Sequence, residues 1–528
     1  MCGPVRLTGR PASGGYAEGP IFCLDNDTGG YVPKGTAAAE AQALRAAIEA
    51  ASEQLAVLAG ASTGEAADML EFQAAMLADV SLSESAFAAI DAGMPADRAW
   101  SDALAGEIAG YEAAQDEYFR ARAADLKDIR QQVLDALTSA GTRTAPLGAI
   151  LFGEDIAPTR FLATDWSAGG GIALSKGSSA SHVAMLARSR GVPMVVGLGS
   201  IAGGIAGIAL LDAEHGGIVL GPTAGDLEEF RRSSAAYGER RRSAEATLAR
   251  PAATANGVPV RVLVNVADPA DVERIDVASC DGVGLMRTEF LFGRELPDEE
   301  TQYRAYRRVL EWAGGKPVTI RTIDAGGDKP VPGFTVAEGN PFLGLRGIRL
   351  SLARPEVFRV QIRALLRAAV HGNLKVMFPM ISVPDEYARA TALFAEEAAN
   401  LAREEVAHAM PPLGIMVEVP SVAIAPEHFA DAAFFSIGSN DLTQYVMAAA
   451  RDNTAVAALN SVTNPAVLTL ISAVAAFGVL HGIPVSLCGD AGGDPVAIPH
   501  LLKAGLRDLS AAPAQLALAK AAVAGVTV

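Results

Sequence analysis

The sequence predicts a multidomain α/β protein, with a small α/β domain interrupted by a helical bundle and followed by a (β/α)8 barrel of the TIM type. Apolar strand candidates alternate with helical segments over about 270 C-terminal residues, which matches such a barrel in count and length. Roughly 100 residues nearer the N-terminus carry apolar side chains at helical spacing with few breakers. Short strand-like segments flank that helical stretch, and 528 residues suffice for about three domains.

The first half of the chain divides by the periodicity of its apolar residues. Residues 1–33 hold two short strand candidates separated by Gly and Pro, and residues 34–138 have the spacing of packed helices. Strand-like segments return over 139–223, so we expect 1–33 and 139–223 to build one discontinuous α/β domain. A helix with many Arg/Glu pairs three or four residues apart follows, and we assign 224–255 to a linker.

The barrel is expected over 256–528. Its eight strand candidates are apolar segments at 259–266, 282–287, 318–322, 374–380, 413–419, 433–438, 483–489 and 506–512. In such a barrel the active site lies at the carboxyl ends of the strands. Six of these ends carry polar or reactive side chains, so we expect a functional site there.

Composition excludes several classes of protein. The net charge of −17 argues against a general nucleic-acid binder. No apolar core of signal-peptide length and no uninterrupted membrane-spanning window occurs, so we expect a cytoplasmic protein without a membrane span. The four cysteines are far apart and form no CxxC, which indicates neither disulfides nor zinc: Cys2, Cys23, Cys280 and Cys488.

Cations gather at the predicted mouth of the barrel, the opening at the carboxyl ends of its strands. They are Arg287, Arg321, Lys329 and Arg451. Guanidinium groups suit phosphate and carboxylate, and converging cations are costly to assemble without an anion between them. Each residue alone could also be an ordinary loop residue.

Two carboxylates follow neighbouring strands at the same mouth. Glu418 ends the fifth strand candidate, and Asp441 lies beside Asn440 after the sixth. Such hard oxygen ligands suit Mg2+, which takes one or two carboxylates with substrate oxygens and water. An anion clamp with Mg2+ indicates phosphoryl transfer. The alternative is that both carboxylates form salt bridges with the arginines.

Cys488 is the cysteine at a predicted strand end. In a cationic mouth its thiol pKa is expected to fall, which favours acid/base exchange. The alternative is a buried, inert cysteine.

His182 opens a predicted helix, because Ser181 is a cap-type residue and "HVAMLARSR" is helical up to Gly191. The first turn of a helix stabilises an anion, and histidine can act as a covalent nucleophile. A phosphohistidine therefore fits here, although a capped histidine without chemistry is the alternative.

The chain resembles enzyme I of the bacterial sugar phosphotransferase system, the phosphoenolpyruvate–protein phosphotransferase family. The resemblance covers essentially the whole chain. Its motifs are "SHVAMLARSRGVPMVVG", "DGVGLMRTEFLF", "TIRTIDAGGDKP", "NPFLGLRGIRL", "MFPMI", "GIMVEVPS", "FFSIGSNDLTQY", "LCGDAGGD" and "GLRDLSAAP", with "DEYFRARAADLKDIRQQVL" in the helical insert.

The resemblance implies a role for each matching position. His182 would carry the phosphoryl group, and Cys488 would protonate the enolate that leaves as pyruvate. Substrate contacts would come from Arg287, Arg321, Arg451, Asn440 and Asp441, with Mg2+ on Glu418 and Asp441. The family also implies a swinging histidine domain, docking of the small carrier HPr on the helical insert, and a homodimer formed through the barrel.

Three positions depart from the family pattern. Ala180 replaces a usual Thr, Asp490 replaces a usual Glu, and Gln73 stands where some members have a histidine at the docking surface. Three alternatives stay open: a nitrogen-regulatory paralogue with another carrier, a relative of phosphoenolpyruvate synthase or pyruvate phosphate dikinase, and a partner-binding paralogue without turnover.

Overall fold

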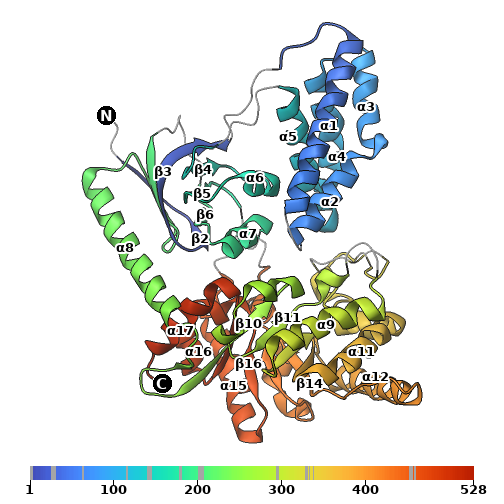
Figure 1. Ribbon diagram of the computed structural model, residues 1–528, viewed down its shortest axis with the longest axis vertical. Coiled ribbons are helices and arrows are strands. Elements are labelled where there is room, and N and C mark those ends of the chain that lie inside the picture. Colours follow the sequence, from blue (N-terminus) through green and yellow to red (C-terminus); the bar gives the residue numbers. More distant parts are fainter. Residues whose placement is uncertain are drawn as a thin grey trace. The chain divides into compact units, whose positions relative to one another are not determined.

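The protein is described by a computed structural model, which divides into two compact units, Met1–Tyr237 and Gly238–Val528 (Figure 1). The division falls inside the charged helix α8 (Ala224–Ala246). The described residues are 4–24, 31–61, 65–113, 117–138, 145–177, 181–199, 207–292, 296–327, 331, 333–336, 338–450, 456 and 459–528.

The first unit contains an eight-stranded sheet in the order β1-β8-β7-β3-β4-β5-β6-β2. Strands β3 to β6 run parallel, and the other pairings are antiparallel. Because β3 pairs with β4 and β7, segments on either side of the helical insert share one sheet, as the fold class predicts. The strands are β1 (Val5–Thr8), β2 (Arg10–Ser13), β3 (Tyr16–Cys23), β4 (Ile150–Gly153), β5 (Gly171–Leu174), β6 (Met194–Val196), β7 (Ile208–Asp212) and β8 (Gly217–Leu220).

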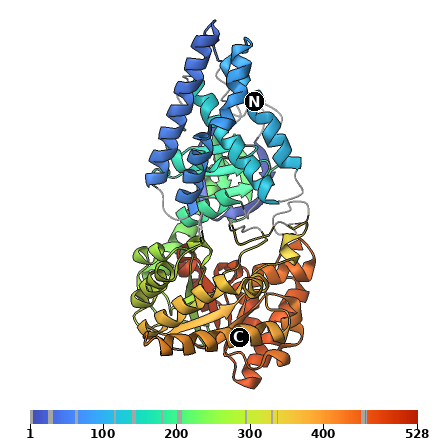
Figure 2. The ribbon, with the colours of Figure 1, turned by 90° about the vertical axis from the view of Figure 1, so that its right-hand side faces the viewer.

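The insert is a bundle whose helices run alongside one another (Figure 2). Its helices are α1 (Ala37–Ala61), α2 (Glu65–Leu77), α3 (Val80–Asp91), α4 (Ala96–Ala113) and α5 (Glu117–Leu137). Local signals fix the turns: Asp79 caps α3 by accepting from the Ser81 amide, and Gly93 has the positive φ of 95° that the α3–α4 turn requires. Trp100 is fully buried in the bundle core.

Two shorter helices accompany the sheet, α6 (Pro158–Ala163) and α7 (His182–Arg190). The Ser181 hydroxyl accepts from the Ala184 amide at 3.2 Å, and Gly191 ends α7 in the left-handed conformation. Val183, Ala184 and Ala187 anchor α7 in the core of the unit. The bounds of α7 are those that the cap and the glycine predict.

The second unit is a closed barrel of eight parallel strands, which confirms the predicted fold class. The short β9 (Ala252–Ala253) adds an antiparallel pairing to β10 outside the barrel. Each predicted strand segment contains one observed strand: β10 (Pro259–Val266), β11 (Val283–Met286), β12 (Val318–Arg321), β13 (Leu374–Phe378), β14 (Leu413–Val417), β15 (Phe435–Ile437), β16 (Val485–Leu487) and β17 (Asp508–Ala511).

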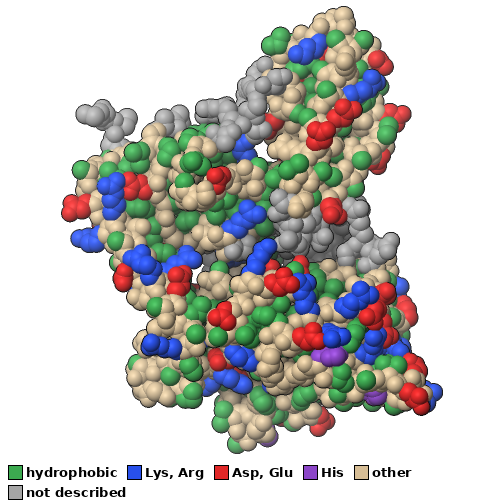
Figure 3. All heavy atoms as spheres, viewed as in Figure 1, with side chains coloured by type: hydrophobic (Ala, Val, Ile, Leu, Met, Phe, Trp, Pro, Cys, Tyr) green, Lys and Arg blue, Asp and Glu red, His purple; other side chains and the backbone are tan. Residues whose placement is uncertain are grey.

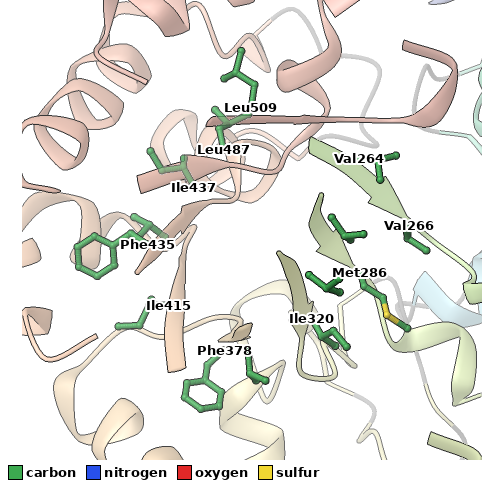
Figure 4. Close-up of a cluster of buried hydrophobic side chains, with 14 of the residues drawn as sticks. Val264, Val266, Met286, Ile320, Phe378, Ile415, Phe435, Ile437, Leu487 and Leu509 are labelled. Atoms are coloured by element: carbon green, nitrogen blue, oxygen red, sulfur yellow. The ribbon is translucent and has the colours of Figure 1, made fainter. Parts of the chain in front are cut away.

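Helices surround the barrel and bury the outward-facing strand residues. Val264, Ile320, Phe378, Ile415 and Leu509 all belong to this core (Figure 4). The helices are α9 (Glu299–Ala313), α10 (Ile348–Ala353), α11 (Pro355–Ala368), α12 (Pro384–Arg403), α13 (Pro420–Ile424), α14 (Ser439–Met447), α15 (Pro465–His481), α16 (Ile498–Lys503) and α17 (Leu516–Ala524).

The outer faces of these helices are strongly charged but mixed in sign (Figure 3). Arg363 on α11, for example, bonds Glu299 at 2.7 Å and Glu404 at 2.6 Å. Such ion pairs at the surface contribute little stability each. In the described ranges, no helix has both the length and the hydropathy that crossing a membrane needs.

Candidate active site at the carboxyl end of the barrel

Alternation along the barrel strands sends every second side chain inward, and the last inward positions form the site. Arg321 ends β12, Glu418 follows β14 and Cys488 follows β16. The structure brings these three predicted residues together, since charges on Arg321 and Glu418 both act on the Cys488 thiol. Lys329 and Arg451 lie outside the described residues, as does the side chain of His182.

Arg321 is buried and paired with two carboxylates. Its guanidinium donates to Glu289 Oε2 and lies 3.0 Å from Asp324 Oδ2. Burial alone would lower the pKa of Arg321, but the neighbouring Glu289, Asp324 and Glu418 raise it. Among the described residues, its Nε has no hydrogen-bond acceptor although it is buried. A buried N–H of this kind is costly unless a ligand oxygen accepts from it.

Arg346 is a second buried arginine, which the strand-end argument missed. Its guanidinium binds Asp324 through two hydrogen bonds of 3.0 Å and Asp441 through bonds of 3.0 and 3.2 Å. Arg346 belongs to the long connection between β12 and α10, so no strand end points to it. The motif "NPFLGLRGIRL" contains it and was its sequence signal.

Glu418 is buried, and a backbone N–H binds its carboxylate. Its Oε1 accepts from the Met380 amide at 2.7 Å, and Met380 has an unusual positive φ of 59°. A Cβ on Gly438 would come within 2.9 Å of Oε2, so a side chain at that position would push on the Glu418 carboxylate. Burial, and then the charges of Asp441 and Asp324, raise the pKa of Glu418 to about 8.

The carboxylates fit a divalent cation that is completed by other oxygens. Glu418 faces two further carboxylates in a buried site, and a cation there would relieve their repulsion. The described residues contain no group of three or more acidic, His or Cys ligands that could hold a metal by themselves. Two carboxylates with substrate and water are, however, the usual set for Mg2+. The salt-bridge alternative is also realised for Asp441, which pairs with Arg346.

Cys488 corrects one prediction. It is 2% exposed, and burial raises its thiol pKa to about 11, although Ser436, Arg321 and Arg287 act to lower it. The prediction of a lowered pKa was wrong, because loss of solvation outweighs the nearby guanidinium groups. The thiol keeps its proton near neutral pH and can donate it. Its Sγ lies 3.6 Å from the Ile437 carbonyl oxygen.

Asn440 is tied to the loop that follows Cys488. Its amide donates to Asp490 Oδ2 at 3.0 Å, and the Asp490 backbone N–H donates to Asn440 Oδ1 at 3.2 Å. Asp490 therefore orients Asn440. Gly489, which lies between Cys488 and Asp490 in the sequence, packs closely on Ser439. A Cβ added to Gly489 would lie 1.9 Å from Ser439 Oγ.

Gln73 in the bundle corrects a second prediction. It is 0% exposed, and its amide donates to Asp125 at 3.2 Å and to Asp128 at 3.3 Å. Gln73 is therefore a buried interhelical residue, and the expectation that it lies on a docking surface was wrong. Helical spacing alone did not distinguish the buried from the exposed side of α2.

A barrel whose carboxyl end holds buried arginines against clustered carboxylates defines an enzyme site for a small, highly charged anion. Three family models match the chain. They are described as PEP-utilising enzyme, PEP-binding domain, over residues 241–528, PEP-utilising enzyme, N-terminal, over 8–122, and PEP-utilising enzyme, mobile domain, over 145–216.

Curated relatives share the same name. A phosphoenolpyruvate-protein phosphotransferase of Geobacillus stearothermophilus is 41% identical over 425 residues, covering 78% of this chain and 73% of that protein. Those of Priestia megaterium and Streptococcus equinus are 36% and 35% identical, and each match covers 96% of this chain and 91% of the relative. The chain belongs to the PEP-utilising enzymes, within the phosphoenolpyruvate-protein phosphotransferase family.

Proposed function

We propose that this enzyme transfers the phosphoryl group of phosphoenolpyruvate to His182, and from there to a histidine of a small HPr-type carrier protein, releasing pyruvate. The observation that carries the proposal is the buried Arg321 guanidinium, which has an N–H without a described acceptor next to a protonated Cys488 thiol. An anion-binding group and a proton donor are what cleavage of an enol phosphate requires.

The proposed reaction breaks the bond between phosphorus and the enol oxygen and forms a bond from phosphorus to a His182 ring nitrogen. The electron pair left on the enolate takes up a proton at carbon, which Cys488 supplies, and the thiolate regains its proton from solvent. A thiol that keeps its proton near neutral pH suits this step better than a thiolate. The step requires His182 to reach the barrel mouth during turnover.

Substrate binding is assigned to the cations of the mouth. Arg287, Arg321, Lys329 and Arg451 would hold the phosphate and carboxylate of the substrate, with Asn440 and Asp441 beside them. Arg346, which holds both Asp324 and Asp441 in place, would fix the carboxylate side of the site. These contacts would orient the substrate and exclude water from the transferring group.

Glu418 and Asp441 would hold Mg2+, whose bound charge would neutralise the phosphate and the enolate oxygen. The backbone bond from Met380 fixes the orientation of Glu418, and the guanidinium of Arg346 fixes that of Asp441. Both carboxylates are therefore oriented by the chain itself before any ligand arrives.

We assign residues 1–33 and 139–223 to the phosphohistidine domain and 34–138 to carrier docking, with the charged helix α8 as linker and the barrel that follows it as the substrate-binding domain. We further propose a homodimer formed through the barrel and a cytoplasmic location. The carrier can be a sugar-system HPr or a nitrogen-regulatory homologue. The names of the curated relatives favour the phosphotransferase over a synthase or dikinase.

Labelled substrate tests the proposal. Incubation with phosphoenolpyruvate labelled on phosphorus and Mg2+ should place acid-labile label on the wild type, and HPr should remove it. His182→Ala should take up no label. His215→Ala is the matched control, because His215 is an exposed turn residue, and it should label normally. Absence of label on the wild type contradicts the function, and label on His182→Ala contradicts the site.

A further inference from the structure

A cavity opens at the other end of the barrel, where the strands begin. It is lined by Arg261 of β10, Lys375 of β13 and Asp508 of β17, among other residues. Asp508 is the first residue of its strand, Lys375 the second and Arg261 the third. Because all eight barrel strands are parallel, this amino end is opposite the candidate active site. The cavity is thus separate from the phosphoryl-transfer machinery.

The charges in this cavity do not balance. Arg261 and Asp508 form a two-pronged ion pair, with Nε to Oδ1 at 2.6 Å and Nη2 to Oδ2. This pair uses both oxygens of Asp508. Lys375 lines the same cavity as a second cation, and burial together with Arg261 lowers its pKa, against the opposing effect of Asp508. Two cations and one carboxylate therefore line the cavity, and Asp281, which is not part of this lining, also acts on Arg261.

The Lys375 ammonium is also short of acceptors. Its Nζ lies 5.4 Å from the centre of the Phe434 ring, and no described residue offers it a hydrogen-bond acceptor or an ion-pair partner. An ammonium has three N–H donors, and a partly buried one is stabilised when an oxygen accepts from it. An oxyanion would supply that oxygen and would offset the repulsion from Arg261.

The remaining walls limit what can bind. Phe434, Pro317 and Pro484 give the cavity apolar faces, while Thr319 and Ser486 add hydroxyl groups. We propose that this cavity binds a small oxyanion, a carboxylate or a phosphate, through Lys375 and Arg261. The inference is independent of the proposed function.

Competitive acetylation of the full-length chain tests the site one lysine at a time. The protein is treated with an N-hydroxysuccinimide ester of acetate, and labelling of each lysine is followed by mass spectrometry. Inorganic phosphate in one arm and acetate in the other serve as the competing anions. Lys503, exposed at the end of α16, is the internal control.

Binding should slow labelling of Lys375 relative to Lys503 by about tenfold at saturation, because a bound anion holds the ammonium protonated and covers it. The arm that protects at the lower concentration identifies the preferred oxyanion. An unchanged Lys375 to Lys503 ratio in both arms would overturn the proposal and leave the cluster as a structural ion pair.

A variant pair gives a second measurement. In the wild type the two anions should raise the melting temperature, and part of that rise should disappear in Lys375→Met but not in Lys503→Met. Phosphoenolpyruvate turnover should stay within about twofold in both variants, since neither side chain lies at the mouth. An equal rise in melting temperature for both variants would contradict binding at Lys375.

Discussion

Cys488 keeps its proton although arginines surround it, because two opposing effects act on the thiol. The guanidinium groups of Arg321 and Arg287 favour the thiolate, whereas full burial and the charge of Glu418 favour the thiol. Burial is the largest effect, so the pKa rises to about 11. The residue type and its position predicted a reactive cysteine, and the depth of burial determines that it acts as an acid.

Cys488→Ala should reduce pyruvate release by about 10²- to 10⁴-fold, the usual contribution of one positioned proton donor. The measurement is steady-state turnover with phosphoenolpyruvate and carrier. Cys280→Ala is the matched control, because Cys280 is also buried in the barrel core but precedes strand β11, away from the carboxyl ends of the strands. Unchanged turnover of Cys488→Ala would contradict the proton-donor role.

The pH dependence of the wild type follows from the same raised pKa. Because the thiol is the donor and its pKa is about 11, its deprotonation should not limit turnover near neutral pH. The activity that depends on the protonated thiol should decline only as the pH approaches that value. Profiles of kcat against pH for the wild type and Cys488→Ala test this. The wild type should lose activity at alkaline pH as the thiol loses its proton, and the residual activity of the variant should not show that loss. A thiol titration near neutral pH would contradict it.

Arg346→Met should destabilise the protein by about 3–5 kcal/mol, because it removes the buried guanidinium that pairs with the buried carboxylates of both Asp324 and Asp441. Denaturant unfolding measures the loss. Arg308→Met is the control: its pair with Glu273 is exposed and should cost less than about 1 kcal/mol. Similar small losses for both variants would show that the Arg346 pairs do not stabilise the site.

Among the elements, α2, α5 and α6 are joined by one buried carboxylate. Asp128 of α5 accepts from Gln73 of α2 and from Thr159 of α6, with Gln132 as a further donor. No cation is among these donors, and burial raises its pKa. In the folded state Asp128 therefore holds a proton at pH values where the unfolded chain has released it.

Wild-type stability should accordingly fall as pH rises from the ordinary Asp pKa through the raised one. Asp128→Asn does not titrate, and its amide can donate to the side-chain oxygens of Gln73 and Gln132, which have no hydrogen-bond donor among the described residues. The variant should gain stability relative to the wild type across that pH window in denaturant unfolding.

Asp79→Asn gives a control of opposite sign. The pKa of Asp79 is lowered by its hydrogen bonds from Ser81, so the stability it contributes is present above the ordinary Asp pKa and lost as pH falls. A pH-independent difference between the wild type and Asp128→Asn would contradict the assignment of a raised pKa to Asp128.

Sequence reasoning predicted the barrel strands correctly because each strand allows only one alternation of inward and outward side chains. An apolar segment such as 318–322 can be buried on the outer face of a barrel while Arg321 points inward, so strand and site residue were predicted together. Arg346 was missed because a loop carries it, and loops have no periodicity to interpret. The buried state of Gln73 and the pKa of Cys488 depend on neighbours from distant segments, which a local pattern does not contain.

For the whole molecule, the second unit has its own core and a closed sheet, so it should fold without the first. Its lower boundary can be located from contacts. Lys520, a buried lysine of α17, donates to the carbonyl oxygens of Leu248 and Arg250, and Ala252 packs in the barrel core. These contacts place residues 248–252 within the folded barrel, so the linker predicted over 224–255 ends earlier than the sequence indicates.

We therefore predict that a fragment of residues 247–528 unfolds cooperatively and binds phosphoenolpyruvate with Mg2+, without becoming phosphorylated because it lacks His182.

A fragment of residues 256–528 is the matched comparison. It loses β9 and leaves the Lys520 ammonium without its two acceptors, and one unsatisfied buried group costs about 1–3 kcal/mol or more when it is charged. Thermal unfolding and calorimetric binding measure both fragments. Equal stability of the two would show that the barrel ends at residue 256 and that the Lys520 contacts contribute nothing to it.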